Sequence, residues 1–201
     1  MERPADADPQ VLDVIRKRWS PYQFSDRRVE PEKLRIILDA ARWAANSFNE
    51  QPWRYIVATK DNPREYERML ACLNESNQVW ARCAPVLMLS FAKRTFTHNG
   101  HPNRVAWHDV GAASCQLTLQ AEALGLRVHQ MAGIETGKIP TVYSVPEDFE
   151  PIAALAIGYP GENLDVPEHL RQRDNRERTR KPLDQFVFEG TWGQAPSVLK
   201  G

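Results

Sequence analysis

The segment Asp109–Leu124 constrains the fold of this chain more than any other part of the sequence. It is the longest predicted helix, and Gly125 after it is a natural helix C-terminal cap. Small and apolar residues lie on more than one of its faces, among them Gly111, Ala112, Cys115, Leu117, Leu119 and Ala123. A helix that is apolar on several sides is buried on several sides, which indicates the centre of a domain or an interface between subunits.

Shorter helices and strands surround this segment in an irregular order. Leu34, Ile37, Leu38 and Ala41 recur with helical spacing, whereas the apolar run Val86–Phe91 is typical of a buried strand. We expect helices over residues 10–18, 31–45 and 63–73, and strands over 54–59, 86–91, 128–131, 152–158 and Phe186–Phe188. The sequence therefore predicts an α+β (α/β) sandwich in which helices cover a small sheet.

The phosphate-binding loop of doubly wound nucleotide folds is missing from the sequence. No glycine-rich turn follows any predicted strand, which argues against that fold. A phosphorylated cofactor would therefore have to be held by side chains.

Charge and hydropathy exclude several classes of partner. Among 201 residues there are 26 Lys and Arg and 26 Asp and Glu, so the net charge gives no reason to expect nucleic acid or an anionic membrane. The apolar runs Val86–Leu89 and Ile152–Ile157 are too short to span a bilayer. Met1–Gln10 lacks the apolar region of a signal peptide, so we expect a cytoplasmic protein. We also expect one domain over residues 10–190, a flexible N-terminal tail over 1–9 and a C-terminal tail over 191–201.

Cysteine and histidine give little sign of a metal site. Cys72, Cys83 and Cys115 are far apart and form no C-x-x-C pair, so we interpret them as small buried apolar residues. His98, His101 and His108 occur in a loop rich in Pro, Asn and Gly, which lacks an ordered scaffold for metal ligands. We predict no metal there and interpret residues 93–108 as a solvated loop.

Four polar segments could carry chemistry. Arg16–Ser20 and Arg178–Lys181 combine cations with hydroxyls and could hold a phosphate, although each could also be a solvated charge run. Ser47, Asn49 and Gln51 alternate with larger residues, so an extended backbone would direct all three to one side. Ala132-Gly133 ends a predicted strand and leaves backbone N–H groups open to a ligand, although a plain turn has the same pattern.

Together these segments resemble the nitroreductase family of flavin mononucleotide (FMN) oxidoreductases over roughly residues 10–190. Arg18-Trp19-Ser20 through Phe24 is similar to the family's Arg-x-Ser-x-basic-x-Phe pattern, and Ser47 through Trp53 reads Ser-Phe-Asn-Glu-Gln-Pro-Trp. Tyr22 stands where the family has a second basic residue, and Ala45-Asn46 replaces its Pro-Ser. The resemblance implies FMN contacts at Arg18, Trp19, Ser20, Ser47, Asn49, Gln51, Asn77, Met131, Ala132, Gly133, Arg178 and Arg180. It also implies that the loop over residues 93–108 covers the substrate face of the flavin, with Phe96, Trp107 and Tyr22 as candidate lid residues.

The resemblance also implies a fold, a reaction and an assembly. The fold would have a central, mainly antiparallel sheet, and the tail, including residues 185–190, would be exchanged in a homodimer. FMN would carry the chemistry, with the Gly133 N–H near flavin N5 and with no catalytic side chain. NADH or NADPH would reduce FMN in a ping-pong reaction with a small acceptor such as a nitroaromatic or a quinone. The alternatives are a flavin storage or sensing protein without turnover, a specialised flavin enzyme such as a dehalogenase, and a dimeric scaffold without flavin.

Overall fold

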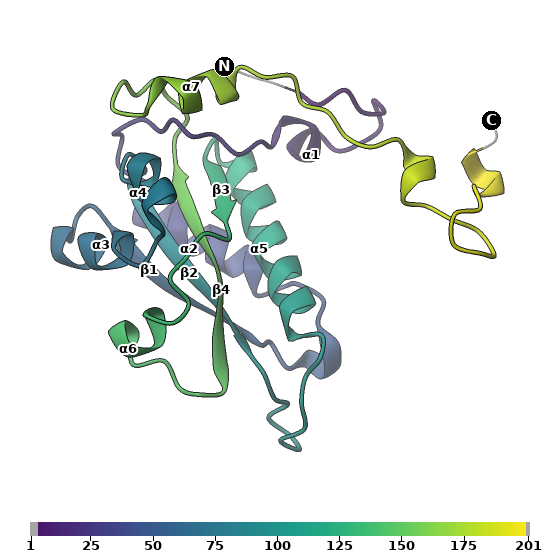
Figure 1. Ribbon diagram of the computed structural model, residues 1–201, viewed down its shortest axis with the longest axis horizontal. Helices are drawn as coiled ribbons and strands as arrows, with labels where there is room; N and C mark the ends of the chain where they lie inside the picture. The colour runs from purple at the N-terminus through teal and green to yellow at the C-terminus, as the bar shows by residue number, and fades with distance from the viewer. Residues whose placement is uncertain (1–3, 200–201) are drawn as a thin grey trace.

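Four antiparallel strands form the centre of the computed structural model, which describes residues 4–199 (Figure 1). Their order across the sheet is β1 (Trp53–Thr59), β2 (Val86–Lys93), β4 (Phe149–Gly158) and β3 (Arg127–Met131). All neighbouring strands in this sheet pair antiparallel, with a register shift between Ser90 and Phe91 of β2. The antiparallel sheet expected from the resemblance is confirmed.

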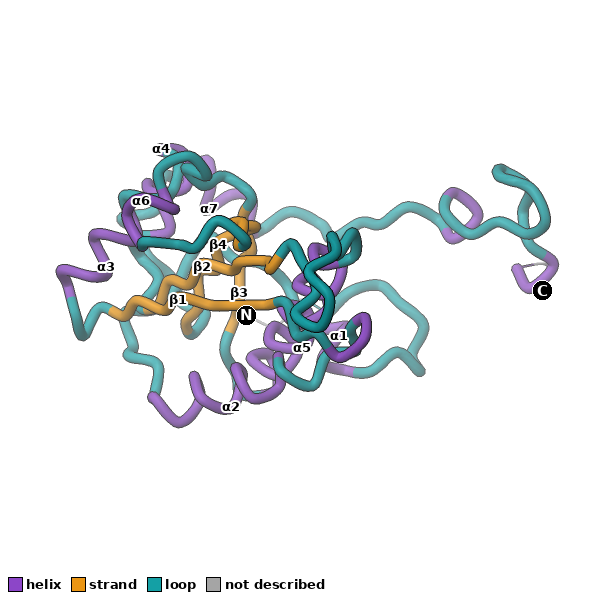
Figure 2. Tube along the Cα trace, turned by 90° about the horizontal axis from the view of Figure 1, so that it is seen from below, coloured by secondary structure: helices purple, strands orange, loops and turns teal. Residues whose placement is uncertain are grey.

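Helices cover both faces of the sheet, which confirms the α+β class. Figure 2 shows α2 and α5 on one face and α4 and α6 on the other. The α-helices are α1 (Asp13–Lys17), α2 (Pro31–Ala41), α3 (Pro63–Leu70), α4 (Glu75–Ala81), α5 (Ala106–Ala123), α6 (Ile139–Tyr143) and α7 (Glu168–Asp174). Short 3-10 helices occur at η1 (Ser47–Asn49), η2 (Leu183–Gln185) and η3 (Ser197–Leu199).

Strand β2 lies in the middle of the core because both of its faces are buried. Met88 packs among residues of α2 and α5 such as Leu117, whereas Leu89 packs among residues of α3 and α4 such as Trp80. A strand covered on both faces needs apolar side chains in both alternating sets, which explains the apolar run in the sequence. Its polar residue Ser90 donates its hydroxyl to the Ala153 carbonyl oxygen at 3.1 Å.

The long helix α5 is buried along most of its circumference but not all of it. Val110, Ala113 and Leu117 are buried against the sheet and α2. An exposed stripe follows the opposite side and consists of Trp107, Gly111, Cys115 and Ala123. The expectation that all three cysteines are buried is therefore wrong for Cys115, because it lies on this stripe, while Cys72 and Cys83 are buried.

Several predicted element boundaries require correction. The helix expected over 10–18 is reduced to α1, since Arg18 already has extended backbone, and the helix expected over 31–45 ends at Ala41. The helix expected over 63–73 ends at Leu70, and a separate helix, α4, begins after the Asn74 cap. Helices α4, α6 and α7 were not predicted, because isolated helices this short depend on tertiary packing.

The C-terminal tail leaves the body of the molecule beyond α5 (Figure 1). Phe186–Phe188 form no strand within the described single chain, and the exchange of this tail with a partner subunit stays a prediction. A strand needs a neighbour for its backbone hydrogen bonds, and the backbone bonds of residues 183–199 join tail residues to one another or to Pro182. Residues 1–3 and 200–201, at the ends of the two expected tails, lie outside the described residues. Across residues 4–199, the helices lack the combination of length and apolar character that crossing a bilayer requires.

Candidate functional site

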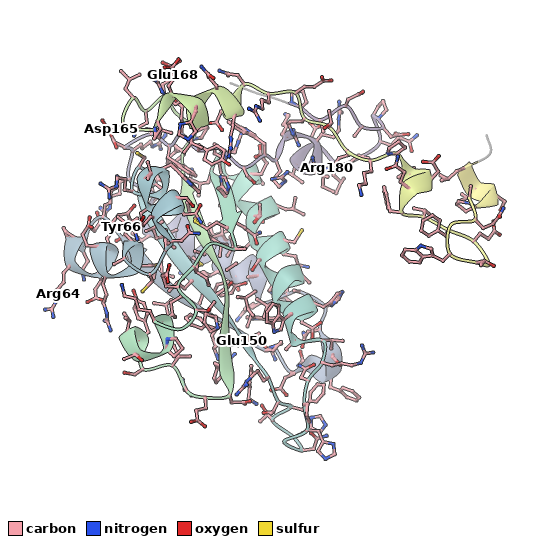
Figure 3. All side chains as sticks on the ribbon, viewed as in Figure 1. Arg64, Tyr66, Glu150, Asp165, Glu168 and Arg180 are labelled. Carbon is pink, nitrogen blue, oxygen red and sulfur yellow. The ribbon has the colours of Figure 1, made fainter. Side chains whose placement is uncertain are left out.

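Two arginines lie near one another where the segment after α1 meets the C-terminal tail. Arg18 donates from Nη1 to Ser20 Oγ at 3.2 Å. Burial lowers the pKa of Arg18, and the positive charge of the nearby Arg180 lowers it further. Figure 3 shows Arg180 on the part of the tail that passes α1. Two neighbouring like charges, of which Arg18 is partly buried and Arg180 exposed, are stabilised by an anion between them, so this cluster is suited to a phosphate group.

The backbone of the same segment is held from two directions by α7 and the tail. Asp174, which is buried, accepts hydrogen bonds from the Tyr22 N–H at 3.0 Å and the Gln23 N–H at 3.1 Å. Arg178 donates to the carbonyl oxygens of Arg16 at 2.8 Å and Arg18 at 2.7 Å. The structure thus brings Arg178 next to Arg18, as predicted. The contact is a hydrogen bond from the Arg178 guanidinium to the Arg18 backbone carbonyl, and the two guanidinium groups do not face a common opening.

Trp19, between Arg18 and Ser20 in the chain, lines a pocket that includes neither Arg18 nor Arg180. Its side chain lines a pocket of about 460 Å³ together with Gln23, Arg171 and Asp174. Packing against α7 in this way fixes the direction of Arg18 and Ser20, its two chain neighbours. The expectation that Trp19 contributes packing and backbone contacts at the FMN site stays a prediction.

Residues 47–51 do not form the extended run expected from their alternation. Ser47–Asn49 is a 3-10 turn, and Phe48, Asn49 and Gln51 all have φ between 50° and 52°. Ser47, Asn49 and Gln51 therefore do not share one side of a strand. Left-handed backbone is uncommon for such residues and costs about 1–3 kcal/mol at each position, so the surrounding bonds must impose it.

Buried carboxylates and an amide supply those bonds. The Ser47 N–H donates to Asp109 Oδ2 at 3.0 Å, and the Gln51 N–H donates to Asn46 Oδ1 at 2.8 Å. Glu50 accepts from Lys93 Nζ at 3.0 Å and from the Thr97 N–H at 2.8 Å, and its side chain is only 5% exposed. Burial alone would raise the pKa of Glu50, but the bonds from Thr97 and Lys93 outweigh it and lower that pKa to about 2.

Gly133, just beyond the end of β3, sits against two asparagines of the α4 region. Asn77 Nδ2 and the Asn74 N–H both donate to the Gly133 carbonyl oxygen, at 3.0 and 3.1 Å. A Cβ at Gly133 would lie 2.4 Å from Asn74 Nδ2, so this close packing requires glycine. Its own N–H finds no acceptor within residues 4–199 and can donate to a ligand. Met131 is buried and Ala132 exposed, so the chain emerges from the core at this point.

His129 on β3 connects the segment that carries Arg18 and Ser20 to the sheet. Its Nδ1 lies 2.8 Å from the Pro21 carbonyl oxygen, and its ring stacks on Trp80 with centroids 4.4 Å apart. Burial lowers the pKa of His129. A neutral ring with the proton on Nδ1 satisfies this geometry, because a carbonyl oxygen can only accept.

Two groups of the predicted site residues lie at opposite ends of α5. The charge of Arg18 interacts with Glu122 and Cys115 in the C-terminal half of the helix, whereas Ser47 bonds to Asp109 in its first turn. Residues 109 and 122 are roughly 20 Å apart along a helix that rises 1.5 Å per residue. One chain therefore does not bring the loop at 47–51 to its own Arg18–Arg180 cluster.

The residues that hold the site together were missed by sequence reasoning. Asp109, Glu50, Asp174 and His129 each bond to backbone or side chains that lie far away in the sequence. A carboxylate near the start of a predicted helix was the one available signal, for Asp109. The other three carry no local pattern that names their partners.

The loop at 93–105 carries aromatic side chains but no metal cluster. Phe96 meets the 80% exposed Phe48 edge to face, with ring centroids 5.6 Å apart. Trp107, at the start of α5, donates from Nε1 to Glu150 Oε2 at 3.1 Å. Over residues 4–199, no group of three or more His, Cys, Asp or Glu is placed to hold a metal ion.

Comparison with known proteins connects these features to one family. Residues 15–159 match the model of the nitroreductase family. A crystal structure described as an oxidoreductase containing FMN is 34% identical, with a TM-score of 0.87 over 94% of this chain and 96% of that one. A provisionally named nitroreductase in complex with FMN from Desulfovibrio desulfuricans is 27% identical, with a TM-score of 0.70 over 92% and 99% of the two chains.

A curated relative carries a name that includes the hydride donor. It is provisionally named NADH dehydrogenase/NAD(P)H nitroreductase, comes from Methanothermobacter thermautotrophicus and is 28% identical over 167 residues. The match covers 76% of this chain and 78% of the relative.

Proposed function

Since this chain belongs to the nitroreductase family of NAD(P)H oxidoreductases, we propose that it works as a homodimer with bound FMN. Each site would take hydride from NADH or NADPH and reduce a small acceptor such as a nitroaromatic or a quinone. The observation that carries the proposal is the separation of the candidate site into two halves at the two ends of α5.

A two-fold dimer would join the two halves. If the exposed stripe of α5 packs against the same stripe of a second copy with the helices antiparallel, the loop at 47–51 of one chain lies beside Arg18 and Arg180 of the other. The self-contact of one patch is the usual geometry of a two-fold dimer. The stripe, with Trp107 at 55% exposure and Trp43 nearby on the surface at 73%, offers the apolar area for it.

The residues present fit FMN. A phosphate dianion matches the Arg18–Arg180 pair, in which the partly buried Arg18 lies near the positive charge of Arg180. The N–H of Gly133 can donate to a flavin ring nitrogen, and the close packing of Asn74 and Asn77 leaves it no freedom to turn away. The polar side chains of the loop at 47–51 can meet the pyrimidine edge and the ribityl chain.

The flavin would supply the hydride chemistry, and the protein would bind and orient it. Arg18, Ser20 and Arg180 would hold the phosphate, and Asp174 with Arg178 would keep that segment in place. The Gly133 N–H would stabilise negative charge at the ring nitrogen it faces. The rigid loop at 47–51, anchored by Asp109 and Glu50, would exclude water from one edge of the ring.

A visible absorption spectrum tests the proposal directly. The purified full chain should be yellow, release FMN on denaturation, and lose its flavin absorbance when NADH or NADPH is added without oxygen. A flavin that neither nucleotide bleaches would replace the enzyme with a flavin storage or sensing protein. A colourless protein that takes up no added FMN would overturn both.

The Arg18 assignment has its own test. Arg18→Ala should weaken FMN binding by about 1.5–3 kcal/mol, the range for a hydrogen bond to a charged group, and should leave riboflavin binding nearly unchanged because riboflavin has no phosphate. Arg64→Ala, on α3 away from the cluster (Figure 3), is the matched control and should change neither affinity. Fluorescence titration of the flavin-free protein measures both. Equal loss for the two flavins would show that Arg18 does not contact the phosphate.

A further inference from the structure

A second pocket lies on the face of the sheet opposite α5. It has a volume of about 310 Å³ and lies between the segment that follows α6 and strands β1, β2 and β4. Its apolar wall includes Ile56, Phe91, Val145 and Phe149. Small-molecule sites have volumes of about 300–1,000 Å³ and mostly apolar walls with few polar groups, so this pocket is large enough for one small ligand. We call it the α6 pocket.

One permanent charge lines the α6 pocket. The Arg54 guanidinium lies over the Phe149 ring, with its central carbon 5.4 Å from the ring centroid. Its Nη1 donates to the carbonyl oxygens of Gln51 at 3.0 Å and Trp53 at 2.7 Å, and its Nε and Nη2 bond to no residue within 4–199. No acidic side chain is part of the lining. The pocket therefore offers an apolar slot with a cationic, hydrogen-bonding rim.

The backbone of the pocket wall is strained in the same way as the candidate site. Among residues 4–199, four non-glycine residues have positive φ: Phe48, Asn49 and Gln51 in the anchored loop, and Ser144 in the α6 pocket at φ 51°. Backbone strain of this kind collects at ligand clamps and active sites. Arg54 connects the two places, because it lines the pocket and holds the Gln51 carbonyl.

We propose that the α6 pocket binds a small, flat, amphipathic carboxylate. The aromatic or aliphatic body would lie between Phe91, Phe149 and Val145, and the carboxylate would accept hydrogen bonds from the open edge of Arg54. A guanidinium pairs with a carboxylate through two parallel hydrogen bonds, which an amide cannot reproduce. The inference does not depend on the proposed flavin chemistry, since none of the proposed FMN contacts lines the pocket.

Calorimetric titration with a matched pair of probes tests the proposal on the full chain. 2-Naphthoate should bind with saturation, and 2-naphthamide, which has the same shape without the charge, should bind about tenfold more weakly or worse. Arg54→Gln should lower naphthoate affinity to the level of the amide. Val145→Trp should fill the slot and weaken naphthoate about tenfold or more, whereas Val79→Trp, on the exposed side of α4, should change nothing.

Two further measurements make the test independent of whether a variant folds and of whether flavin is bound. Amide chemical-shift changes in the unmodified protein should concentrate at residues 143–149 and Arg54, which needs no variant to fold. The flavin absorbance should stay unchanged during the titration. Absence of saturable naphthoate binding, equal binding of the amide, unchanged binding in Val145→Trp, or competition between naphthoate and FMN would each overturn the proposal.

Discussion

Asp174 and Arg178 act on the backbone of a segment far from them in sequence. The carboxylate receives the N–H groups of Tyr22 and Gln23, and the guanidinium donates to the carbonyls of Arg16 and Arg18. A basic residue at 178 was predicted from the sequence as a phosphate contact. The structure adds a second role for Arg178. Because the N–H groups and the carbonyl groups of the segment around Arg18 are both hydrogen-bonded, the segment has a fixed backbone and directs the Arg18 side chain one way.

His129 makes the stability of this segment depend on pH. Because burial lowers its folded pKa below the unfolded value near 6.5, the unfolded state binds a proton first as the pH falls. The contribution of His129 to the free energy of unfolding should therefore be complete above about pH 6.5, and it should decrease as the pH falls below that value. Asn at this position keeps a donor near the place of Nδ1 and does not titrate.

The measurement compares His129→Asn with the unmodified protein in urea unfolding between pH 8 and pH 5. In that pH range the free energy of unfolding of His129→Asn should depend less steeply on pH than that of the unmodified protein, because the contribution of His129 is missing. The exposed His169→Asn is the control and should keep the full slope. An identical slope in both variants would show that His129 is not buried in neutral form.

At the scale of elements, the loop at 47–51 and the segment around α6 show where sequence patterns stop being informative. Alternation of Ser47, Asn49 and Gln51 predicts a strand, yet Asp109, Asn46 and Glu50 impose left-handed turns. The strands over 54–59, 86–91 and 152–158 could be predicted because burial requires local apolarity. The turns could not, because Asp109 and Thr97, which bond to Ser47 and Glu50, are more than 40 residues away in the chain.

Ser144 and Phe48 share a φ of 51° and should respond differently to glycine. Ser144→Gly relieves strain without losing a side-chain hydrogen bond to the described residues, so the free energy of unfolding should rise by about 1 kcal/mol. Phe48→Gly relieves the same strain but removes the ring contacts with Phe96 and His98, so the gain should be smaller. FMN affinity should fall only in Phe48→Gly if the loop faces the flavin.

Urea unfolding of the flavin-free protein measures both effects. Thr141→Gly, at an ordinary helical position of α6, is the control and should lower stability slightly, by about 0.3 kcal/mol. A loss of stability in Ser144→Gly would mean that the left-handed backbone there carries no strain.

At the scale of the whole molecule, the exposed stripe of α5 leads to a prediction about assembly. A Cβ at Gly111 would meet nothing within 4 Å in the single chain, so Gly111→Leu should fold and even favour the helix by about 1 kcal/mol. If two α5 helices pack there in the dimer, the added side chain should separate them. Gly137→Leu, which is equally open and lies before α6, is the control.

Sedimentation velocity at micromolar concentration distinguishes the two variants. Gly111→Leu should be a folded monomer that retains little FMN, because each site would lose the loop of the other chain. Gly137→Leu should remain a dimer with FMN. A flavin-loaded dimer of Gly111→Leu would place the interface elsewhere.

Two truncations separate the contributions of the tail. Removal of residues after Asp174 deletes Arg178 and Arg180, so both the anion cluster and the backbone clamp on Arg16 and Arg18 are lost. Removal of residues after Lys181 keeps that cluster and deletes the part of the tail that projects beyond α5, with Phe186 and Trp192 exposed at 58% and 90% (Figure 2). Exposed aromatic rings on a projecting segment are suited to burial against a second chain.

Removal of the residues after Lys181 should therefore weaken the dimer, while each remaining dimer still binds FMN. Removal of the residues after Asp174 should abolish both dimer formation and FMN binding. Sedimentation equilibrium gives the dimer affinity, and absorbance after denaturation gives the FMN content per chain. Far-UV circular dichroism should be nearly unchanged for the protein that ends at Lys181, since residues 182–199 contribute no α-helix or strand to the body. If the protein that ends at Asp174 still yields an FMN-loaded dimer, neither the arginine cluster nor the tail belongs to the site, and the phosphate must be sought at another part of the interface.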